Sequence, residues 1–252
     1  MKKILIIGFI CKFLIPFAYS QTEDHVKGGW FTKTVEYNLR MLEDLYNFNS
    51  KGEVEKLFFG DFNAPVEFFY NPSFEEASGF RIVKDTVKMS YILEIKYVSN
   101  YEEIASEMEK KYPLIGDRGD LSKVVSDEKT VGELIRNYNR NNINKKFEES
   151  LKLFKVESRS FPICKRFAEE MYKVMVSVIE NFKAKGVPPI FNDGYEVTFR
   201  NVVEDEVWSL KIHIPTGTSL KLANLCRKII TETLATGMVD ESSYIKLLDD
   251  FN

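Results

Sequence analysis

Histidine and cysteine are scarce in this sequence, and their scarcity limits the chemistry that it can support. The 252 residues contain two histidines, His25 and His213, and three cysteines. No His-Glu-x-x-His motif, paired Cys-x-x-Cys or calcium-loop spacing occurs, so the sequence predicts no metal site and no cofactor. A Gly-x-Ser-x-Gly elbow and a Walker loop are also missing, which removes the common motifs of serine hydrolases and nucleotide-binding enzymes.

Long apolar stretches are missing except at the N-terminus. A basic start, Met1-Lys2-Lys3, precedes an apolar run that extends to Phe17 and is interrupted by Lys12. Ala18-Tyr19-Ser20 then offers small residues at the −3 and −1 positions of a cleavage site, with Gln21 as the new N-terminus. This order is typical of a secretory signal, and we therefore predict a cleavable signal peptide over residues 1–20.

Two alternatives to cleavage fit the N-terminus less well. A retained anchor needs about 20 apolar residues, and the run here is shorter and contains Lys12. Lipid attachment at Cys11 would need a small residue before it, whereas Ile10 occupies that position. The prediction is therefore an exported chain, periplasmic or secreted, that does not span a membrane after signal removal.

The charge balance is close to even and slightly acidic. The formal net charge is −3, and loss of Lys2, Lys3 and Lys12 with the signal changes it to −6. Such a chain has no overall attraction to nucleic acid or to an anionic membrane, so we predict no nucleic-acid partner. Aromatic residues make up 13% of the chain, which argues against disorder.

Two cysteines remain after signal removal, Cys164 and Cys226. In an oxidising compartment they can form one disulfide. They can equally be two separate core residues, because sequence does not place their Cα atoms within bridging distance.

The clearest structural pattern is a hairpin followed by a helix, which occurs twice. Residues 80–97 alternate with period two, as do 195–214, and each pair of predicted strands precedes a helical pattern. This predicts an α+β fold: antiparallel hairpins with helices packed on one face. The polar stretch 116–129 divides the chain into N-terminal (21–115) and C-terminal (130–252) lobes, which can also form one domain.

Four further segments have weaker patterns. Apolar spacing of three and four predicts a helix over 34–48, and a shorter helix is expected over 130–139. Alternation predicts a strand over 151–158. Ser160 before Phe161-Pro162 resembles a helix start, so the apolar stripe that ends at Phe182 is expected to begin there.

One catalytic arrangement is suggested by residue type. Cys164 falls in the first turn of a predicted helix beside Lys165 and Arg166, an environment that lowers a thiol pKa. With His213 it could form a nucleophile–base pair, although Cys164 also borders an apolar stripe and His213 alternates with polar strand residues. A carboxylate pair for glycoside chemistry cannot be selected from the 38 acidic residues.

The candidate binding residues are Tyr70, Phe74 and Arg81. They belong to a segment in which aromatic residues flank a turn rich in Pro, Ser and Gly, and exposed aromatics of this kind can form a binding lip. In the alternative interpretation, Phe74 and Phe80 anchor the loop to the core.

Part of the chain resembles uncharacterised exported proteins of the Bacteroides group. The residues that carry the resemblance are Asn71–Asp85, Tyr91–Lys96, Val207–Pro215 and Leu225-Cys226-Arg227. The resemblance implies export from a Gram-negative cell and implies no activity.

Two hypotheses of function follow. The first is a non-enzymatic binding or envelope-associated module, whose partner would be an envelope protein or a glycan. The second is a secreted hydrolase acting on glycans or peptides, with a site that no motif reveals. A spatial meeting of Cys164 with His213, or of two carboxylates in a cleft, would favour the hydrolase.

Overall fold

A computed structural model describes residues 31–37, 51–60, 63–85, 90–116, 128–183, 194–204 and 206–251. The predicted signal, residues 1–20, and His25 lie outside the described residues, as does most of the polar stretch between the two predicted lobes.

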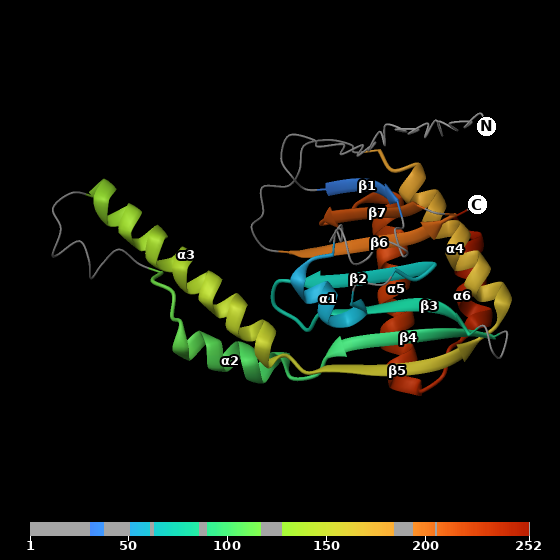
Figure 1. The fold of residues 1–252 in the computed structure, drawn as a ribbon, viewed down its shortest axis with the longest axis horizontal. Coiled ribbons are helices and arrows are strands. Elements are labelled where there is room, and N and C mark those ends of the chain that lie inside the picture. Colours follow the sequence, from blue (N-terminus) through green and yellow to red (C-terminus); the bar gives the residue numbers. More distant parts are fainter. Residues whose placement is uncertain are drawn as a thin grey trace, which may run out of the picture.

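In the described residues, one central antiparallel sheet has seven strands (Figure 1). Its spatial order is β1-β7-β6-β2-β3-β4-β5, and every neighbouring pair is antiparallel. The strands are β1 (Phe31–Tyr37), β2 (Val66–Pro72), β3 (Ser78–Asp85), β4 (Ser90–Val98), β5 (Val156–Ile163), β6 (Tyr195–Val203) and β7 (Glu206–His213). Because β2 pairs with β6, strands from both predicted lobes belong to the same sheet.

The described helices are α1 (Glu53–Phe59), α2 (Tyr101–Lys111), α3 (Glu128–Leu153), α4 (Lys165–Glu180), α5 (Gly217–Thr236) and α6 (Glu241–Asp249). Helices α4, α5 and α6 cover one face of the sheet, behind it in Figure 1. The α+β prediction is confirmed, and its expectation of helices on one face holds for these three.

The main core lies between this face and the three helices. Alternate residues of the central strands point into it, including Phe68, Phe80, Leu93 and Phe199, each with 0% of its surface exposed. The period-two alternation in the sequence thus arises from strands whose alternate side chains are buried on this face of the sheet. The apolar stripe of α4 supplies the opposing layer, because residues spaced by three and four share one side of a helix.

Helix α1 packs on the opposite face of the sheet (Figure 1). Phe58 and Phe59 of α1 form a second, smaller core with Phe69 of β2. Gly79 of β3 permits this approach, because a Cβ there would lie 3.1 Å from the Phe59 ring and 2.6 Å from the Phe68 carbonyl oxygen. The short segment 54–59, whose type the sequence leaves open, is therefore a helix held by aromatic packing.

Helices α2 and α3 form a hairpin that extends away from the edge of the sheet, which we call the arm (Figure 1). Lys111 Nζ lies 2.6 Å from Glu149 Oε2, and the Asn139 side-chain amide both donates to and accepts from the backbone of Ile115, each at 2.9 Å. These contacts link the two sides of the hairpin.

The arm overturns two predictions. α3 runs without interruption from Glu128 to Leu153, so the helix predicted to end at 139 is longer and the strand predicted from 151 begins only at Val156. Residues 137–144 of α3 are rich in asparagine, and two of these amides have partners in the segment that joins α2 to α3. Besides Asn139, Asn142 donates to the Pro113 carbonyl oxygen at 2.9 Å. Tertiary contacts here override low helix propensity.

The helix predicted from Ser160 also begins later. Residues 156–163 form β5, and Cys164 is the N-cap of α4. Pro162 is tolerated in β5 because β5 is an edge strand, where a missing backbone donor need not break a ladder.

The predicted helix over 34–48 is wrong at its start. Phe31–Tyr37 is strand β1, which pairs with β7 at the other edge of the sheet. Residues 38–48 of that prediction lie outside the described part of the chain. The helix prediction depends on the spacing of Val35 and four later apolar residues. Of these five, only Val35 lies in the segment that forms β1, and one residue cannot distinguish a helix from a short strand.

Candidate functional site

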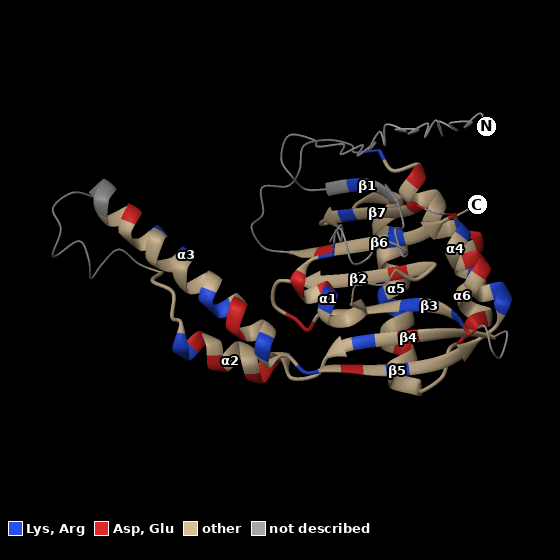
Figure 2. Ribbon diagram, viewed as in Figure 1, with Lys and Arg blue, Asp and Glu red and all other residues tan. Residues whose placement is uncertain are grey.

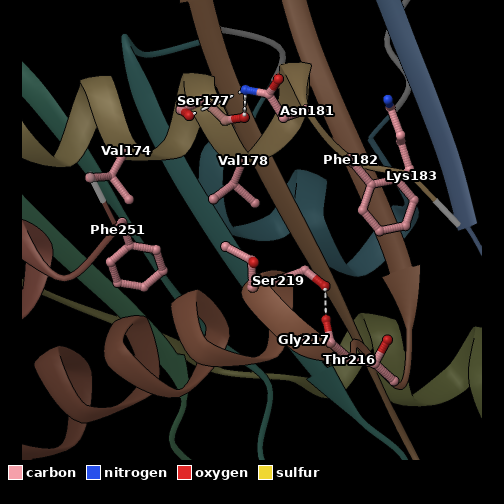
Figure 3. A pocket seen from close by; sticks show the side chains of 11 residues that line it. Val174, Ser177, Val178, Asn181, Phe182, Lys183, Thr216, Gly217, Ser219 and Phe251 are labelled. Atoms are coloured by element: carbon pink, nitrogen blue, oxygen red, sulfur yellow. Dashed lines mark hydrogen bonds between the residues drawn. The ribbon is translucent and has the colours of Figure 1, made fainter. Parts of the chain in front are cut away.

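A cavity of about 530 Å³ lies where the end of α4 meets the start of α5 (Figure 3). The lining residues are Val174, Ser177, Val178, Asn181, Phe182, Lys183, Thr216, Gly217, Thr218, Ser219 and Phe251. The volume falls within the range of small-molecule sites, roughly 300–1,000 Å³.

The cavity has an apolar interior and a polar rim. Figure 3 shows Val174, Val178 and Phe182 projecting from the α4 side, with Phe251 and Ser219 among the residues that face them. Hydrogen bonds at the ends of the two helices orient two of the polar side chains. Ser219 Oγ donates to the Thr216 carbonyl oxygen at 2.8 Å, and Asn181 Nδ2 donates to the Ser177 carbonyl oxygen at 2.9 Å.

The lining offers binding groups and little for catalysis. Its polar members are hydroxyls, one amide and one ammonium, that of Lys183, and it includes no carboxylate, imidazole or thiol. Nucleophilic catalysis by one of these hydroxyls would depend on Lys183 as its general base, and the Ser219 hydroxyl instead donates to the Thr216 carbonyl oxygen. The geometry therefore fits an amphipathic ligand more closely than a reaction.

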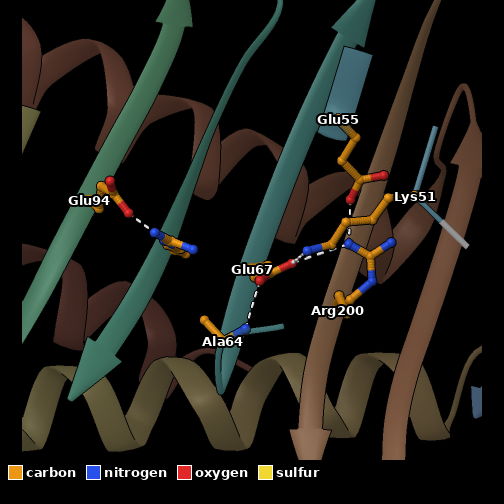
Figure 4. Close-up of polar contacts among 7 residues, drawn as sticks. Lys51, Glu55, Ala64, Glu67, Glu94 and Arg200 are labelled. Atoms are coloured by element: carbon orange, nitrogen blue, oxygen red, sulfur yellow. Dashed lines mark hydrogen bonds and ion pairs between the residues drawn. The ribbon is translucent and has the colours of Figure 1, made fainter. Parts of the chain in front are cut away.

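A second site is a row of charges across the other face of the sheet (Figure 4). Residues in register on neighbouring strands form it: Ser209, Arg200, Glu67, Arg81, Glu94 and Ser160. The signs alternate over the four central strands, so each charged residue faces an opposite charge, the favourable cross-strand arrangement.

The centre of the row is closed off by α1 and the residues before it. Arg200 contacts the carboxylates of Glu55 and Glu67, and Lys51 Nζ lies 3.2 Å from Glu67 Oε2. The four side chains are 0–4% exposed. Glu67 also accepts a hydrogen bond from the Ala64 backbone N–H at 2.6 Å. We call these four residues the buried charge cluster.

The pKa shifts in this cluster reflect competition between burial and attraction. Burial disfavours the charged form of Arg200, but the charges of Glu55 and Glu67 outweigh it and raise the pKa of the guanidinium. For Lys51 burial is the larger effect, and it lowers the ammonium pKa despite the neighbouring Glu67. Two cations and two carboxylates make the cluster neutral overall.

The buried charge cluster meets one requirement of a glycosidase and fails another. Glu55 and Glu67 contact the same Arg200 nitrogen, so their separation is compatible with the roughly 5.5 Å of retaining enzymes. Both side chains are nevertheless at most 4% exposed and bound to cations. A sugar cannot reach them, and the arrangement is that of a structural ion-pair network.

Arg81 continues the row beyond the cluster. It forms an ion pair with Glu94, whose other oxygen lies 3.3 Å from Lys96 Nζ and accepts a hydrogen bond from Ser158 Oγ at 3.1 Å. Burial alone would raise the pKa of Glu94, but Arg81 and Lys96 together lower it. The Arg81 side chain is thus paired with Glu94 on the face of the sheet that α1 covers.

Of the other two predicted binding residues, Tyr70 belongs to the main core, on the face of the sheet opposite Arg81, and Phe74 follows β2 in a loop. Tyr70 is 5% exposed, and Phe74 in the following loop is 73% exposed. The Arg227 guanidinium of α5 lies 4.2 Å from the Tyr70 ring centre and 5.8 Å from that of Tyr195. Burial and Glu75 raise the pKa of Tyr70 to about 12. Tyr70 is therefore part of the core, Phe74 is at the surface, and Arg81 lies on the other face of the sheet. The three residues do not form one binding site.

The proposed disulfide is absent. Cys164 and Cys226 are free thiols, the first exposed and the second buried. Cys226 lies on the core side of α5 with 0% exposure, whereas the Cys164 sulfur caps α4 by accepting a hydrogen bond from the Phe167 N–H at 3.4 Å. Their elements hold them at different depths, so a bridge would require the core to open.

The Cys164–His213 pair is not formed either. Cys164 directly follows β5, and His213 ends β7, five strand positions away across the sheet. At about 4.8 Å per strand, the lateral separation is roughly 24 Å. A nucleophile and its base must lie within hydrogen-bond reach, so this thiol arrangement does not support catalysis.

Sequence reasoning missed both sites. Glu67 and Arg200 were detectable, because each is a charged residue within an apolar strand run, Val66–Tyr70 and Val197–Val203. Such a charge is normally paired when buried. The cavity had no comparable signal, since it depends on how the end of α4 approaches the start of α5.

The fold class is thus an α+β protein with one antiparallel sheet, a helical layer on one face and a charged row on the other. No family model, curated protein or solved structure matches the chain. Among the described helices, none combines the length and the apolar character needed to cross a membrane. In the same described segments, no group of three or more His, Cys, Asp or Glu side chains is placed to hold a metal ion.

Proposed function

We propose that this is an exported, non-enzymatic binding protein, and that its ligand is a small amphipathic molecule held in the cavity between α4 and α5. The observation that carries the proposal is the lining: an apolar interior with hydroxyl, amide and ammonium groups at its rim. Small-molecule sites typically combine a mostly apolar wall with a few placed polar groups.

The chemistry of the lining indicates which end of the ligand faces which residues. Val174, Val178, Phe182 and Phe251 would contact an apolar body. Lys183 is the single charged residue of the lining, so a negatively charged end group at the rim is favoured over a positive one. A medium-chain carboxylate has both features.

The hydrolase hypothesis receives less support from the described residues. The paired carboxylates, Glu55 and Glu67, are closed off from solvent, and Cys164 and His213 lie at opposite sides of the sheet. Neither arrangement lies at the cavity. Export enters the proposal through the N-terminal sequence pattern and the resemblance described above.

The proposal is tested by calorimetric titration of the mature protein, residues 21–252, with sodium decanoate. Binding is expected, and Val178→Phe should weaken it at least about tenfold, because added ring atoms occupy the cavity. Met238→Phe is the matched control. Met238 is 72% exposed and follows α5, whose 20 residues separate it by about 30 Å from the cavity end.

A charge variant identifies the polar end. Lys183→Glu should weaken binding of decanoate and leave binding of 1-decanol unchanged. Absence of binding by the wild-type protein, or unchanged binding by Val178→Phe with intact circular dichroism, would contradict the proposal.

A further inference from the structure

The arm exposes apolar side chains that its own two helices do not cover. On α3, Leu134, Tyr138, Ile143 and Phe147 are 52%, 42%, 50% and 47% exposed. Ile143 and Phe147 are four residues apart and therefore share one side of the helix. Leu134 and Tyr138 form a second pair on the other side of the helix, about 180° away at 3.6 residues per turn. The Ile143–Phe147 pair is therefore the apolar surface considered below.

The charges of the arm are separated along its length. Residues 134–147 of α3 contain four basic residues and no acidic one, whereas residues 101–109 of α2 contain four acidic residues and no basic one. Figure 2 shows the acidic part of α2 near the sheet and basic positions of α3 farther out.

Most of these charges remain available to a partner. The ion pairs within the described arm join Lys111 to Glu149 and Lys146 to Glu109. Within these two stretches, six exposed residues take no part in them: Glu102, Glu103 and Glu107 on α2, and Arg136, Arg140 and Lys145 on α3. The two stretches thus offer three negative and three positive charges, and the exposed Lys110, Glu133, Glu148 and Lys152 lie outside them.

The two charged regions are offset along the arm. Asn100, just before α2, donates to the Leu153 carbonyl oxygen, and Glu109 pairs with Lys146, so the acidic region lies level with the last turns of α3. The basic region is centred about ten residues earlier, which corresponds to roughly 15 Å. The midpoint of the two regions falls near residues 143–147, where Ile143 and Phe147 are exposed.

We propose that two copies of this chain associate through their arms in an antiparallel, two-fold symmetric pair. A two-fold axis at residues 143–147 places Ile143 and Phe147 of both copies together. It also brings the basic region of each arm opposite the acidic region of the other. A two-fold interface requires this kind of self-complementary surface, and helix pairs with apolar seams and flanking charges associate in this way.

A second copy fits the arm better than nucleic acid does. The three basic positions lie beside an equal number of acidic ones, and an anionic polymer along the arm would meet Glu102, Glu103 and Glu107. In a pair of arms, both charge regions are matched.

Sedimentation velocity of the mature protein over a range of concentrations tests the proposal. A dimer is expected that weakens as salt increases, because exposed charge pairs are screened. Phe147→Asp should weaken dimerisation by about tenfold or more, since it places a carboxylate at the seam. Leu57→Asp is the control, because Leu57 is exposed to a similar degree, 42%, but lies on α1.

Charge-reversal variants distinguish the proposed antiparallel pairing of the arms from nonspecific association. Arg136→Glu with Arg140→Glu should weaken the dimer about tenfold, and Glu102→Lys with Glu103→Lys should do the same. The four substitutions together should restore dimerisation. A monomeric wild-type protein at all concentrations in low salt, or a lack of rescue among variants with native circular dichroism, would overturn the proposal.

Discussion

Arg200 is the residue on which the charged face of the sheet depends. It is 1% exposed and lies between Glu55 and Glu67. Its removal would leave two buried carboxylates with Lys51 as the remaining cation of the cluster. The cost of an unpaired buried charge exceeds the gain from the pair itself, so the residue matters more for stability than a surface arginine does.

We therefore expect Arg200→Met to lower the free energy of unfolding by about 3–5 kcal/mol. Urea denaturation measures this. Arg81→Met is the matched control, because Arg81 pairs with Glu94 in the same row but is 23% exposed. Its loss should cost about 1 kcal/mol or less. Equal losses in the two variants would show that burial does not determine the cost.

Glu94 gives the stability a specific dependence on pH. Although burial opposes it, Arg81 and Lys96 lower the pKa of Glu94 below its ordinary value of 4.5. A carboxyl with a lowered folded-state pKa stabilises the protein above its unfolded pKa, and this contribution is lost as pH falls through the folded pKa. The stability difference between wild type and Glu94→Gln should thus be full at pH 6 and disappear in strong acid.

Urea denaturation at a series of pH values measures this difference. Glu76→Gln is the control, because Glu76 is exposed in the loop after β2 and forms no ion pair with a described residue. A difference for Glu94→Gln that stays constant from pH 6 to strong acid would contradict the prediction.

The two thiols should differ sharply in reactivity. Burial raises the pKa of Cys226 well above its usual value of 9.0, and the side chain is 0% exposed, whereas Cys164 is exposed. Because the thiolate is the reactive form, Ellman's reagent should titrate one thiol in the native mature protein and two after unfolding. Cys164→Ala should abolish the fast phase. Rapid reaction of both thiols in the native protein would contradict this prediction. So would the absence of any reactive thiol until a reductant is added, because that result would indicate a disulfide.

Among the elements, those with strong internal periodicity were predictable from the sequence. The hairpins β3–β4 and β6–β7 follow directly from alternation, and the helices after them, α2 and α5, follow from three-and-four spacing. Three features were not predictable in this way: strand β1, the end of α3 and the start of α4. Their assignment depends on a partner distant in sequence, such as β7 for β1.

The same distinction applies to the candidate sites. Glu67 and Arg200 are visible in the sequence as charges inside apolar strands, but their mutual contact depends on strand order. The cavity is not visible at all, because sequence patterns do not determine how the helix that carries Val178 approaches the helix that carries Ser219.

The link between Asn139 and Ile115 gives the arm a testable weak point. Asn139→Ala removes both hydrogen bonds to the Ile115 backbone. A loss of about 1 kcal/mol is expected for such a change, which corresponds to about fivefold faster hydrogen exchange in residues 110–116. Asn141→Ala is the control, since Asn141 is an exposed neighbour on α3. Equal exchange in both variants would exclude a role for Asn139 in holding the arm.

At the scale of the whole molecule, the prediction concerns cleavage of the signal peptide. N-terminal sequencing of protein recovered from the periplasm or the medium should begin at Gln21, because Ala18 and Ser20 supply the small residues of a cleavage site. Replacing Ser20 by a bulky residue should delay processing. Recovery of a chain that retains Met1 would contradict both the signal and the exported location.

The position of β1 has a consequence for how the chain reaches its native state. β1 comes first in the described chain, yet its sheet neighbour β7 ends at His213. The strand therefore has no native partner until most of the polypeptide has been made. Pairings between such distant segments slow folding. Unpaired strand edges also promote aggregation while the sheet is incomplete. During synthesis the segment of β1 would thus remain unpaired for longer than the strands of the neighbouring hairpins β3–β4 and β6–β7.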